Sequence, residues 1–217
     1  MTSKLSDFVL VVCALVMVAL VARNQSRGGT ASESETPTDS VVSDADYYRD
    51  LSRRSGSEDV QAEIVVFTDY QCPFCKRLWH ALDSLRAESP DAVALTVRHF
   101  PLAGIHPQAR AASAFVECAR RENKFREADS ILFAWPDSVE RGAWTSIASL
   151  IGMESPASVN KCMASNGITE LIDADIAAAR RLGATGTPMM LVNTVRVRGA
   201  RSVEQIRRII AESHGSD

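Results

Sequence analysis

Residues 64–75 read IVVFTDYQCPFC, and they set the expectation for the rest of the chain. The β-branched start predicts a buried strand, and the apolar spacing that follows predicts a helix beginning at Cys72-Pro73-Phe74-Cys75. Pro73 suits the first helical turn, where a backbone N–H would lack a partner. The positive end of the helix dipole stabilises a thiolate on Cys72. A thiolate is the nucleophile of thiol–disulfide exchange, so Cys72 and Cys75 are predicted to form a redox-active disulfide.

Two other interpretations of the cysteine pair are half of a zinc site and two structural thiols. Zinc sites usually need four ligands, and the chain has no second CxxC and no histidine pair at ligand spacing. The redox interpretation is therefore favoured, with no metal and no other cofactor expected.

Size and charge narrow the function further. The chain has 217 residues, 46% of them apolar, which is enough for one core with an added subdomain. It carries 24 Lys and Arg against 27 Asp and Glu, a net charge of −3. Its arginine pairs are scattered, as on solvated helix faces, so a nucleic-acid partner is not expected.

An uncharged apolar run occupies residues 8–22. As a helix it would span about 22 Å, short of the roughly 30 Å hydrocarbon core of a bilayer. Residues 1–22 are thus expected to be either a cleavable signal or a short membrane anchor. Leu20 stands at the −3 position of the best cleavage site, which favours an uncleaved, single-pass anchor.

Cysteine usage indicates the compartment. Five cysteines, two of them in the CxxC and two more on predicted helices, fit an oxidising environment. The C-terminal bulk of the chain is therefore expected on the extracytoplasmic (periplasmic) side of the membrane.

The segment after the apolar run predicts a tether. Residues 24–44 are rich in Ser, Thr, Gly and Glu and carry few large apolar side chains. A short helix over residues 46–54 is expected to follow, with Tyr48 and Leu51 on one face. The predicted organisation is a flexible tether over residues 23–57 and a folded domain over residues 58–217.

Within the folded domain the predicted order is β-α-β, a helical block, then β-β-α. Strands are expected at residues 63–68 and 92–99 around a helix at 75–87. Helical patterns fill most of the stretch from about residue 101 to 184. Strands at 189–192 and 195–198 flank Asn193-Thr194, and a helix over 203–211 ends the domain. This is an α/β, thioredoxin-like order with a helical insertion between its two halves.

With this order in place, the chain resembles the DsbA-like thiol–disulfide oxidoreductases of the thioredoxin superfamily, in their membrane-tethered bacterial branch. The resemblance covers roughly residues 63–211. Four passages carry it: residues 66–75, residues 98–112, residues 117–125 and residues 186–193 with Thr187-Pro188.

The resemblance implies a role for each active-site residue. Cys72 would be the more exposed sulfur, which forms the mixed disulfide with a substrate, and Cys75 the resolving thiol. Thr187 and Pro188 would form a cis-proline loop that pairs with an extended substrate segment. The expected function is a dithiol oxidase acting on exported proteins with cysteines, re-oxidised by an unidentified membrane or periplasmic partner.

One residue departs from the family pattern, and another is expected to affect the reduction potential. Val66 stands where the family often has a buried Glu that assists proton movement from the second cysteine, so the route here is expected to use Asp69 or water. Phe74 between the cysteines carries no charge. The reduction potential is therefore expected between the values of DsbA and thioredoxin, about −120 and −270 mV.

Cys118 and Cys162 lie on the apolar faces of predicted helices. Buried free thiols are one interpretation. The oxidising compartment, and a similar pair in related tethered proteins, favour a structural disulfide. His99 and His106 are interpreted as structural or loop residues, and Trp135 and Trp144 as core residues.

The sequence leaves rival functions open. One is a thiol reductase or a disulfide isomerase, although an isomerase usually needs a dimerisation module and a monomer is expected here. Another is a redox-inactive, membrane-tethered module that binds unfolded clients, against which the intact CxxC argues.

Overall fold

The computed structural model describes residues 40–50 and 52–213. Over these residues six strands form one mixed sheet in the order β1-β6-β5-β3-β4-β2. β3 pairs in parallel with β4 and antiparallel with β5, and the other neighbouring strands are antiparallel. The strands are β1 Ser40–Val41, β2 Arg54–Ser55, β3 Ala62–Thr68, β4 Val93–His99, β5 Met189–Val192 and β6 Val195–Arg198.

β3 lies inside the sheet, between β5 and β4, and both of its faces are buried. Ile64 and Val66 face one core, together with apolar residues of α2 (Pro73–Glu88) and α9 (Val203–Ser213). Val65 and Phe67 face a second core on the opposite side of the sheet. Successive side chains of a strand point to opposite faces, so an unbroken apolar run is what such a strand requires.

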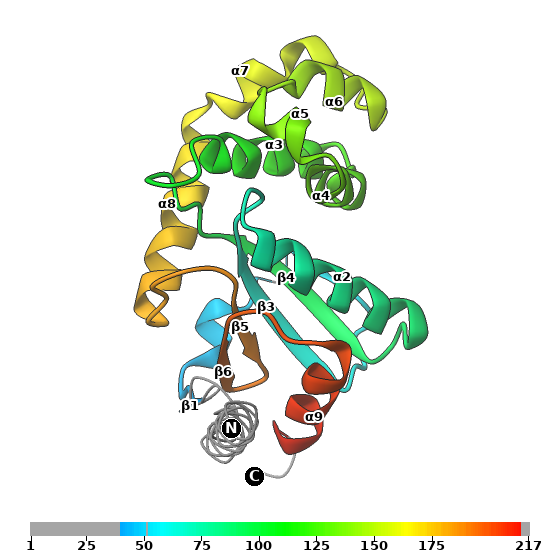
Figure 1. Cartoon of the computed structure of the whole chain (residues 1–217), viewed down its shortest axis with the longest axis vertical. Coiled ribbons are helices and arrows are strands. Elements are labelled where there is room, and N and C mark those ends of the chain that lie inside the picture. Colours follow the sequence, from blue (N-terminus) through cyan, green and yellow to red (C-terminus); the bar gives the residue numbers. More distant parts are fainter. Residues whose placement is uncertain (1–39, 51, 214–217) are drawn as a thin grey trace, which may run out of the picture. The chain divides into compact units, whose positions relative to one another are not determined.

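Most of the helices between β4 and β5 form a separate block with its own core, drawn at the top of Figure 1. The second half of the last helix continues down beside the sheet, where Ala178 and Ala179 join the core around Val65 and Phe67. This helix, α8, ends where Leu182 is followed by Gly183 at φ 81°. These helices confirm the predicted insertion and, with the sheet, the thioredoxin-like α/β fold. They are α3 Ala109–Arg121, α4 Phe125–Ala134, α5 Pro136–Glu140, α6 Trp144–Leu150, α7 Val159–Met163, preceded by the 3-10 turn η2 Pro156–Ser158, and α8 Asn166–Arg181.

The folded domain begins earlier in the chain than residue 58, where its N-terminal boundary was predicted. Residues 40–50 and 52–57 belong to the same structural unit as the rest of the described domain rather than to a tether. β1 and β2 add a strand to each edge of the sheet, and a 3-10 turn, η1 (Ala45–Tyr48), replaces the helix predicted over residues 46–54. Tyr48 is buried against Phe67, with ring centroids 6.3 Å apart, so the segment is held by packing as well as by strand pairing.

The predicted anchor over residues 8–22 and the predicted tether up to residue 39 lie outside the described residues. In the part of the chain that the structure describes, no helix is long and apolar enough to cross a membrane.

A buried charged cluster joins the sheet, the helical block and the N-terminal segment. Arg53 donates to Asp175 of α8 and to Glu117 of α3, and all three side chains are at most 4% exposed. His99 at the end of β4 completes it, with its Nε2 atom 2.8 Å from Glu117 Oε1 and its backbone N–H donating to Asp175. His99 is therefore a structural residue, as expected.

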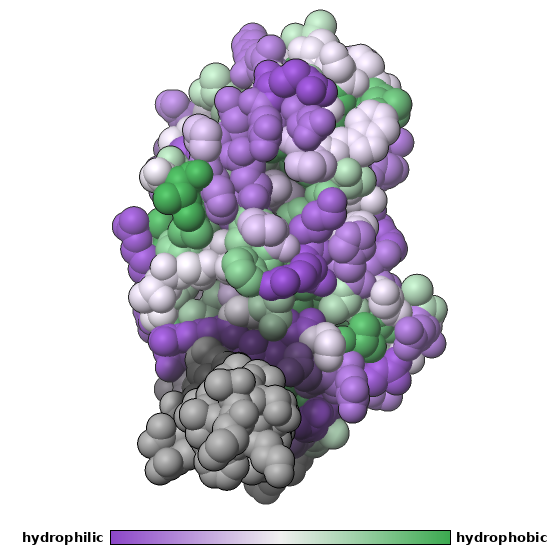
Figure 2. Space-filling view, in the orientation of Figure 1, coloured by the Kyte–Doolittle hydropathy of each residue, from purple (hydrophilic) through white to green (hydrophobic). Residues whose placement is uncertain are grey.

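The surface drawn in Figure 2 is mostly hydrophilic, with apolar side chains in small separate groups. Scattered exposed apolar residues are normal for a soluble domain, so they do not single out a docking face. Trp135 is one of them at 51% exposed, so the prediction that it is a core residue was wrong, whereas Trp144 is buried.

Candidate active site

The CPFC sequence lies where the chain leaves β3 and enters α2. Cys72 is the extended residue just before the helix (φ −78°, ψ 120°), and Pro73 is the first helical residue. Cys75 lies one turn into the helix. Both cysteines are free thiols and both are buried, at 5% and 2% exposed. The local chain direction thus places both sulfurs at the positive end of a 16-residue helix.

The loop before β5 approaches the same sulfurs. Its Thr187–Pro188 peptide bond is cis, and Cys72 Sγ lies 3.5 Å from the carbonyl oxygen of Thr187. The hydroxyl group of Thr187 is buried and has no hydrogen-bond partner among the described residues, so it is free to donate to Cys72 when that sulfur is a thiolate. Residues more than a hundred positions apart in the sequence therefore form one site.

The two thiols differ in acidity. A hydrogen bond from the Cys75 thiol lowers the pKa of Cys72 to about 5, helped by Thr187 and the backbone N–H groups of Cys75 and Phe74 against the effect of burial. Burial raises the pKa of Cys75 well above its usual value, and the neighbouring Cys72 raises it further. At neutral pH the site therefore holds a thiolate on Cys72 and a protonated thiol on Cys75.

Asp69 supports the loop between β3 and α2. Its carboxylate accepts hydrogen bonds from the backbone N–H groups of Gln71 and Leu102, both at 2.8 Å, and lies 2.8 Å from His106 Nδ1. Only its backbone N–H reaches a sulfur, donating to Cys75 Sγ at 3.4 Å. The pairing with His106 was missed from the sequence, where that histidine was interpreted as a structural or loop residue without a partner being named.

Phe74, between the two cysteines, points outward. Its side chain is 50% exposed, and the guanidinium of Arg77 lies 4.4 Å from the ring centroid. Pro73 is exposed as well. These side chains form part of the accessible surface beside Cys72.

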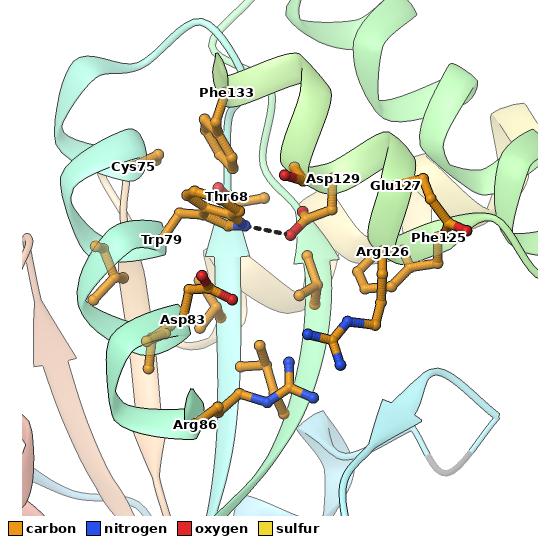
Figure 3. Close-up of a pocket in the computed structure, with 16 residues that line it drawn as sticks. Thr68, Cys75, Trp79, Asp83, Arg86, Phe125, Arg126, Glu127, Asp129 and Phe133 are labelled. Carbon is orange, nitrogen blue, oxygen red and sulfur yellow. Dashed lines mark hydrogen bonds between the residues drawn. The ribbon is translucent and has the colours of Figure 1, made fainter. Parts of the chain in front are cut away.

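A second buried carboxyl group lies behind the cysteines. Asp129 of α4 lines a cavity that Val66 and Cys75 also line (Figure 3). Its carboxylate accepts hydrogen bonds from the Tyr70 hydroxyl at 2.8 Å and the Trp79 indole N–H at 2.7 Å. Burial raises the pKa of Asp129. An acid is thus present near Val66, but it comes from the helical insertion rather than from β3.

Sequence reasoning missed Asp129, although a signal was present. It is an ionisable residue between Ala128 and Ile131 on a predicted apolar helix face. Such a residue needs buried hydrogen-bond donors, which the aromatic side chains of Tyr70 and Trp79 supply.

Cys118 and Cys162 are joined in a disulfide that links α3 to α7, with their Cα atoms 6.1 Å apart. The bond lies within the core of the helical insertion. It is separate from the CPFC pair, whose thiols remain free.

Metal-ligating clusters were also considered. Over residues 40–50 and 52–213, no group of three His, Cys, Asp or Glu side chains is placed to hold a metal ion.

Comparison with known proteins gives sequence relatives that are much longer than this chain. One is a protein named Na(+)/H(+) antiporter NhaA 1 from Mycolicibacterium gilvum, 28% identical over 161 residues, which are 74% of this chain and 26% of the relative. The chain spans about a quarter of the length of such relatives.

Solved structures share the fold over nearly their whole length. A thioredoxin-like oxidoreductase from Silicibacter pomeroyi superposes with a TM-score of 0.67 at 23% identity, covering 78% of this chain and 96% of that one. The thiol-disulfide exchange protein α-DsbA2 from Wolbachia pipientis gives a TM-score of 0.62 at 22% identity, covering 77% and 90%. The family model described as Thioredoxin matches residues 50–212. The chain therefore belongs to the thioredoxin family, with the fold that DsbA-like thiol–disulfide oxidoreductases share.

Proposed function

We propose that this chain is an extracytoplasmic thiol–disulfide oxidoreductase that transfers its Cys72–Cys75 disulfide to exported proteins. The observation that carries the proposal is the position of two free thiols at the start of α2, with Cys72 Sγ 3.5 Å from the carbonyl oxygen of the cis Thr187–Pro188 loop. Their pKa values are shifted in opposite directions, that of Cys72 to about 5 and that of Cys75 well above its usual value. In such a pair, one sulfur can form a mixed disulfide with a substrate and the other can resolve it.

The chemistry consists of two exchange steps. A substrate thiolate attacks Cys72 Sγ, the Cys72–Cys75 bond breaks, and Cys75 leaves and takes up a proton, as its raised pKa requires. A second thiolate of the substrate then attacks the substrate sulfur of the mixed disulfide, and Cys72 leaves as a thiolate. The substrate dithiol loses two electrons and the enzyme disulfide gains them.

The low pKa of Cys72 supports the oxidase direction. A thiolate that is stable at neutral pH is a good leaving group in the second step, and it stabilises the reduced enzyme relative to the oxidised one. A disulfide whose reduced form is stabilised gives up its bond readily. The reaction is thus driven toward substrate oxidation.

The loop at Pro188 is the proposed substrate-binding element. It approaches Cys72 closely through Thr187, so an extended peptide that pairs with this backbone would bring its own cysteine next to Cys72 Sγ. The exposed Phe74 would supply apolar contact at the edge of the same surface. Recognition through backbone atoms suits an enzyme with many client sequences.

The proposed location and domain organisation are those expected from the sequence, except that the tether ends at residue 39 instead of residue 57. Residues 1–22 would be the single-pass anchor and residues 23–39 the tether, with the enzymatic domain on the periplasmic side. The buried disulfide between Cys118 and Cys162 supports an oxidising compartment. A monomer re-oxidised by a membrane or periplasmic redox partner completes the proposal.

Oxidative refolding of a reduced model protein tests the function. The oxidised enzyme should accelerate disulfide formation, Cys72→Ser should abolish the acceleration, and Cys75→Ser should accumulate mixed disulfides with the client. Full activity of Cys72→Ser would overturn the proposal. A reduction potential close to that of thioredoxin, about −270 mV, would instead indicate a reductase.

A further inference from the structure

A cavity of about 330 Å³ lies between α2, α4 and the sheet, behind the CPFC helix (Figure 3). This volume is within the range of about 300–1,000 Å³ that small-molecule sites occupy. The walls are largely apolar and come from three parts of the fold. They include Val66, Leu82, Leu95, Val97, Phe125 and Phe133.

Two arginines stand at one end of this cavity. Arg86 extends from α2 and Arg126 from α4, and Figure 3 shows their guanidinium groups directed toward one another across the gap between the helices. Both also line a second depression of about 530 Å³, so the arginine end of the cavity continues to the surface.

Among residues 40–50 and 52–213, no carboxylate forms an ion pair or a hydrogen bond with Arg86 or Arg126. Three carboxylates, Asp83, Glu127 and Asp129, line the cavity as well. Glu127 lies 3.5 Å from Lys124, which is its ion-pair partner. The cavity therefore has a largely apolar body, and its mouth holds Arg86 and Arg126 next to Asp83.

The electrostatics favour a single negative charge at this mouth. Burial lowers the pKa of Arg86, and the positive charge of Arg126 lowers it further. One anionic group between the two would relieve this repulsion. Asp83 and Asp129 face the same cavity and act on Arg86 in the opposite direction, so a doubly charged group would meet more repulsion than a singly charged one.

We propose that this cavity binds a small amphipathic carboxylate, with its carboxylate between Arg86 and Arg126 and its apolar body among the walls of the cavity. The planar guanidinium fork matches a carboxylate, which can accept two parallel hydrogen bonds from it. The body of the ligand lies on the side of the cavity where Cys75 is found.

The binding site is distinct from the substrate surface at Phe74 and Pro188, which do not line this cavity. The proposal does not depend on the redox function, because it rests on the cavity and its charges alone. Binding and thiol chemistry can therefore be measured separately on the same protein.

Calorimetric titration of the full chain with two water-soluble acids, octanoate and 2-naphthoate, tests the proposal. Their neutral amides, octanamide and 2-naphthamide, are the ligand controls. We expect saturable binding of at least one acid with one site per chain, and binding of its amide that is weaker by at least about tenfold, because hydrogen bonds to charged groups are the stronger ones. The acid that binds better identifies the body as aliphatic or aromatic.

Charge variants locate the site. Arg86→Gln with Arg126→Gln should weaken binding of the acid at least about tenfold and leave binding of the amide unchanged. The matched control, Arg121→Gln with Arg208→Gln, removes the same charge from exposed positions outside the cavity and should bind like the parent protein. Thermal unfolding and the ultraviolet titration of Cys72 verify that each variant is folded.

Three results would overturn the proposal. They are the absence of saturable binding of either acid at millimolar concentration, equal binding of acid and amide, and equal weakening by the cavity variant and its control. None of them bears on the exchange chemistry of Cys72, whose failure would appear in the refolding assay instead.

Discussion

Arg53 forms a two-pronged ion pair with Asp175, a residue 122 positions further along the chain. Its Nη1 atom donates to Asp175 Oδ1 at 2.9 Å and its Nη2 atom to Oδ2 at 2.8 Å. Arg98 and the backbone N–H of His99 also donate to the same carboxylate. This buried pair holds the segment before β3 against the helical insertion, and it explains why residues 40–57 fold with the domain.

Replacing Arg53 by Met should destabilise the protein strongly. The substitution leaves Asp175 buried without its two-pronged partner and removes one of the cations beside Glu117, and breaking a buried pair in this way costs about 3–5 kcal/mol of unfolding free energy. Urea unfolding measures the change. The control is Arg207→Met, which removes an exposed ion pair with Glu88 and should cost no more than about 1 kcal/mol. Equal losses for the two variants would contradict the role given to Arg53.

The buried cluster around Arg53, Glu117 and Asp175 also makes the free energy of unfolding depend on pH. His99, Arg53 and Arg120 outweigh the effect of burial and hold the pKa of Glu117 at about 2, below the value of about 4.3 expected when unfolded. A lowered pKa contributes stability that is complete above the unfolded value and is lost as the pH falls through about 4 toward 2.

Glu117→Gln should therefore lose stability at neutral pH and show a smaller further loss between pH 5 and 2 than the parent protein. Urea unfolding at several pH values measures this. Asp129→Asn is a useful contrast, because burial raises the pKa of Asp129 and gives it the opposite pH dependence. A slope that is unchanged in Glu117→Gln would show that other carboxylates account for acid unfolding.

The central strand, the CPFC helix and the order of the two halves could be predicted because they depend on local signals. An unbroken β-branched apolar run, Pro73 at a helix start and a block of helical spacing each specify their element without reference to distant residues. The edge strands β1 and β2 could not be predicted in this way. They are two residues long, and their stability comes from pairing with β6 and β4, which lie far away in the sequence.

The site shows the same division. The thiol pair is visible in the sequence because both members lie within four residues. The partners of Asp69 and Asp129 are not visible in the sequence. His106 comes next to Asp69, and Trp79 next to Asp129, only when the helical insertion packs against the sheet. The burial of Arg53 was missed for a similar reason: a charged residue near a polar segment is ordinarily exposed, and only a distant carboxylate makes its burial favourable.

Thr187→Val should raise the pKa of Cys72 above about 5, because Thr187 is one of the groups that lower it. Cys75→Ala should raise it further, since the hydrogen bond from the Cys75 thiol has the largest effect. Thiolate absorbance near 240 nm as a function of pH measures both. Thr185→Val, at an exposed position two residues away, is the control and should leave the titration unchanged.

The pKa of Cys72 also predicts how the stability of the reduced protein varies with pH. Because the folded value of about 5 lies below the value of about 8.5 for an unfolded thiol, this group's contribution is complete above about pH 8.5 and is lost as the pH falls to about 5. In Cys72→Ser that part of the pH dependence should disappear. Its persistence would mean that another group titrates in this range.

Removing the disulfide of the helical insertion should affect stability without affecting the exchange chemistry. In Cys118→Ala with Cys162→Ala, the unfolded chain regains the freedom of a loop with a sequence separation of 44, which corresponds to about 4 kcal/mol in the chain-entropy model. For a domain of this size that is a fall in melting temperature of about 8–16 °C. Scanning calorimetry measures the fall, and the ultraviolet titration of Cys72 should stay at a midpoint of about 5, since neither residue is among the groups that shift the pKa of Cys72 most. A shifted Cys72 titration with an unchanged melting temperature would reverse the assignment and make this disulfide part of the redox site.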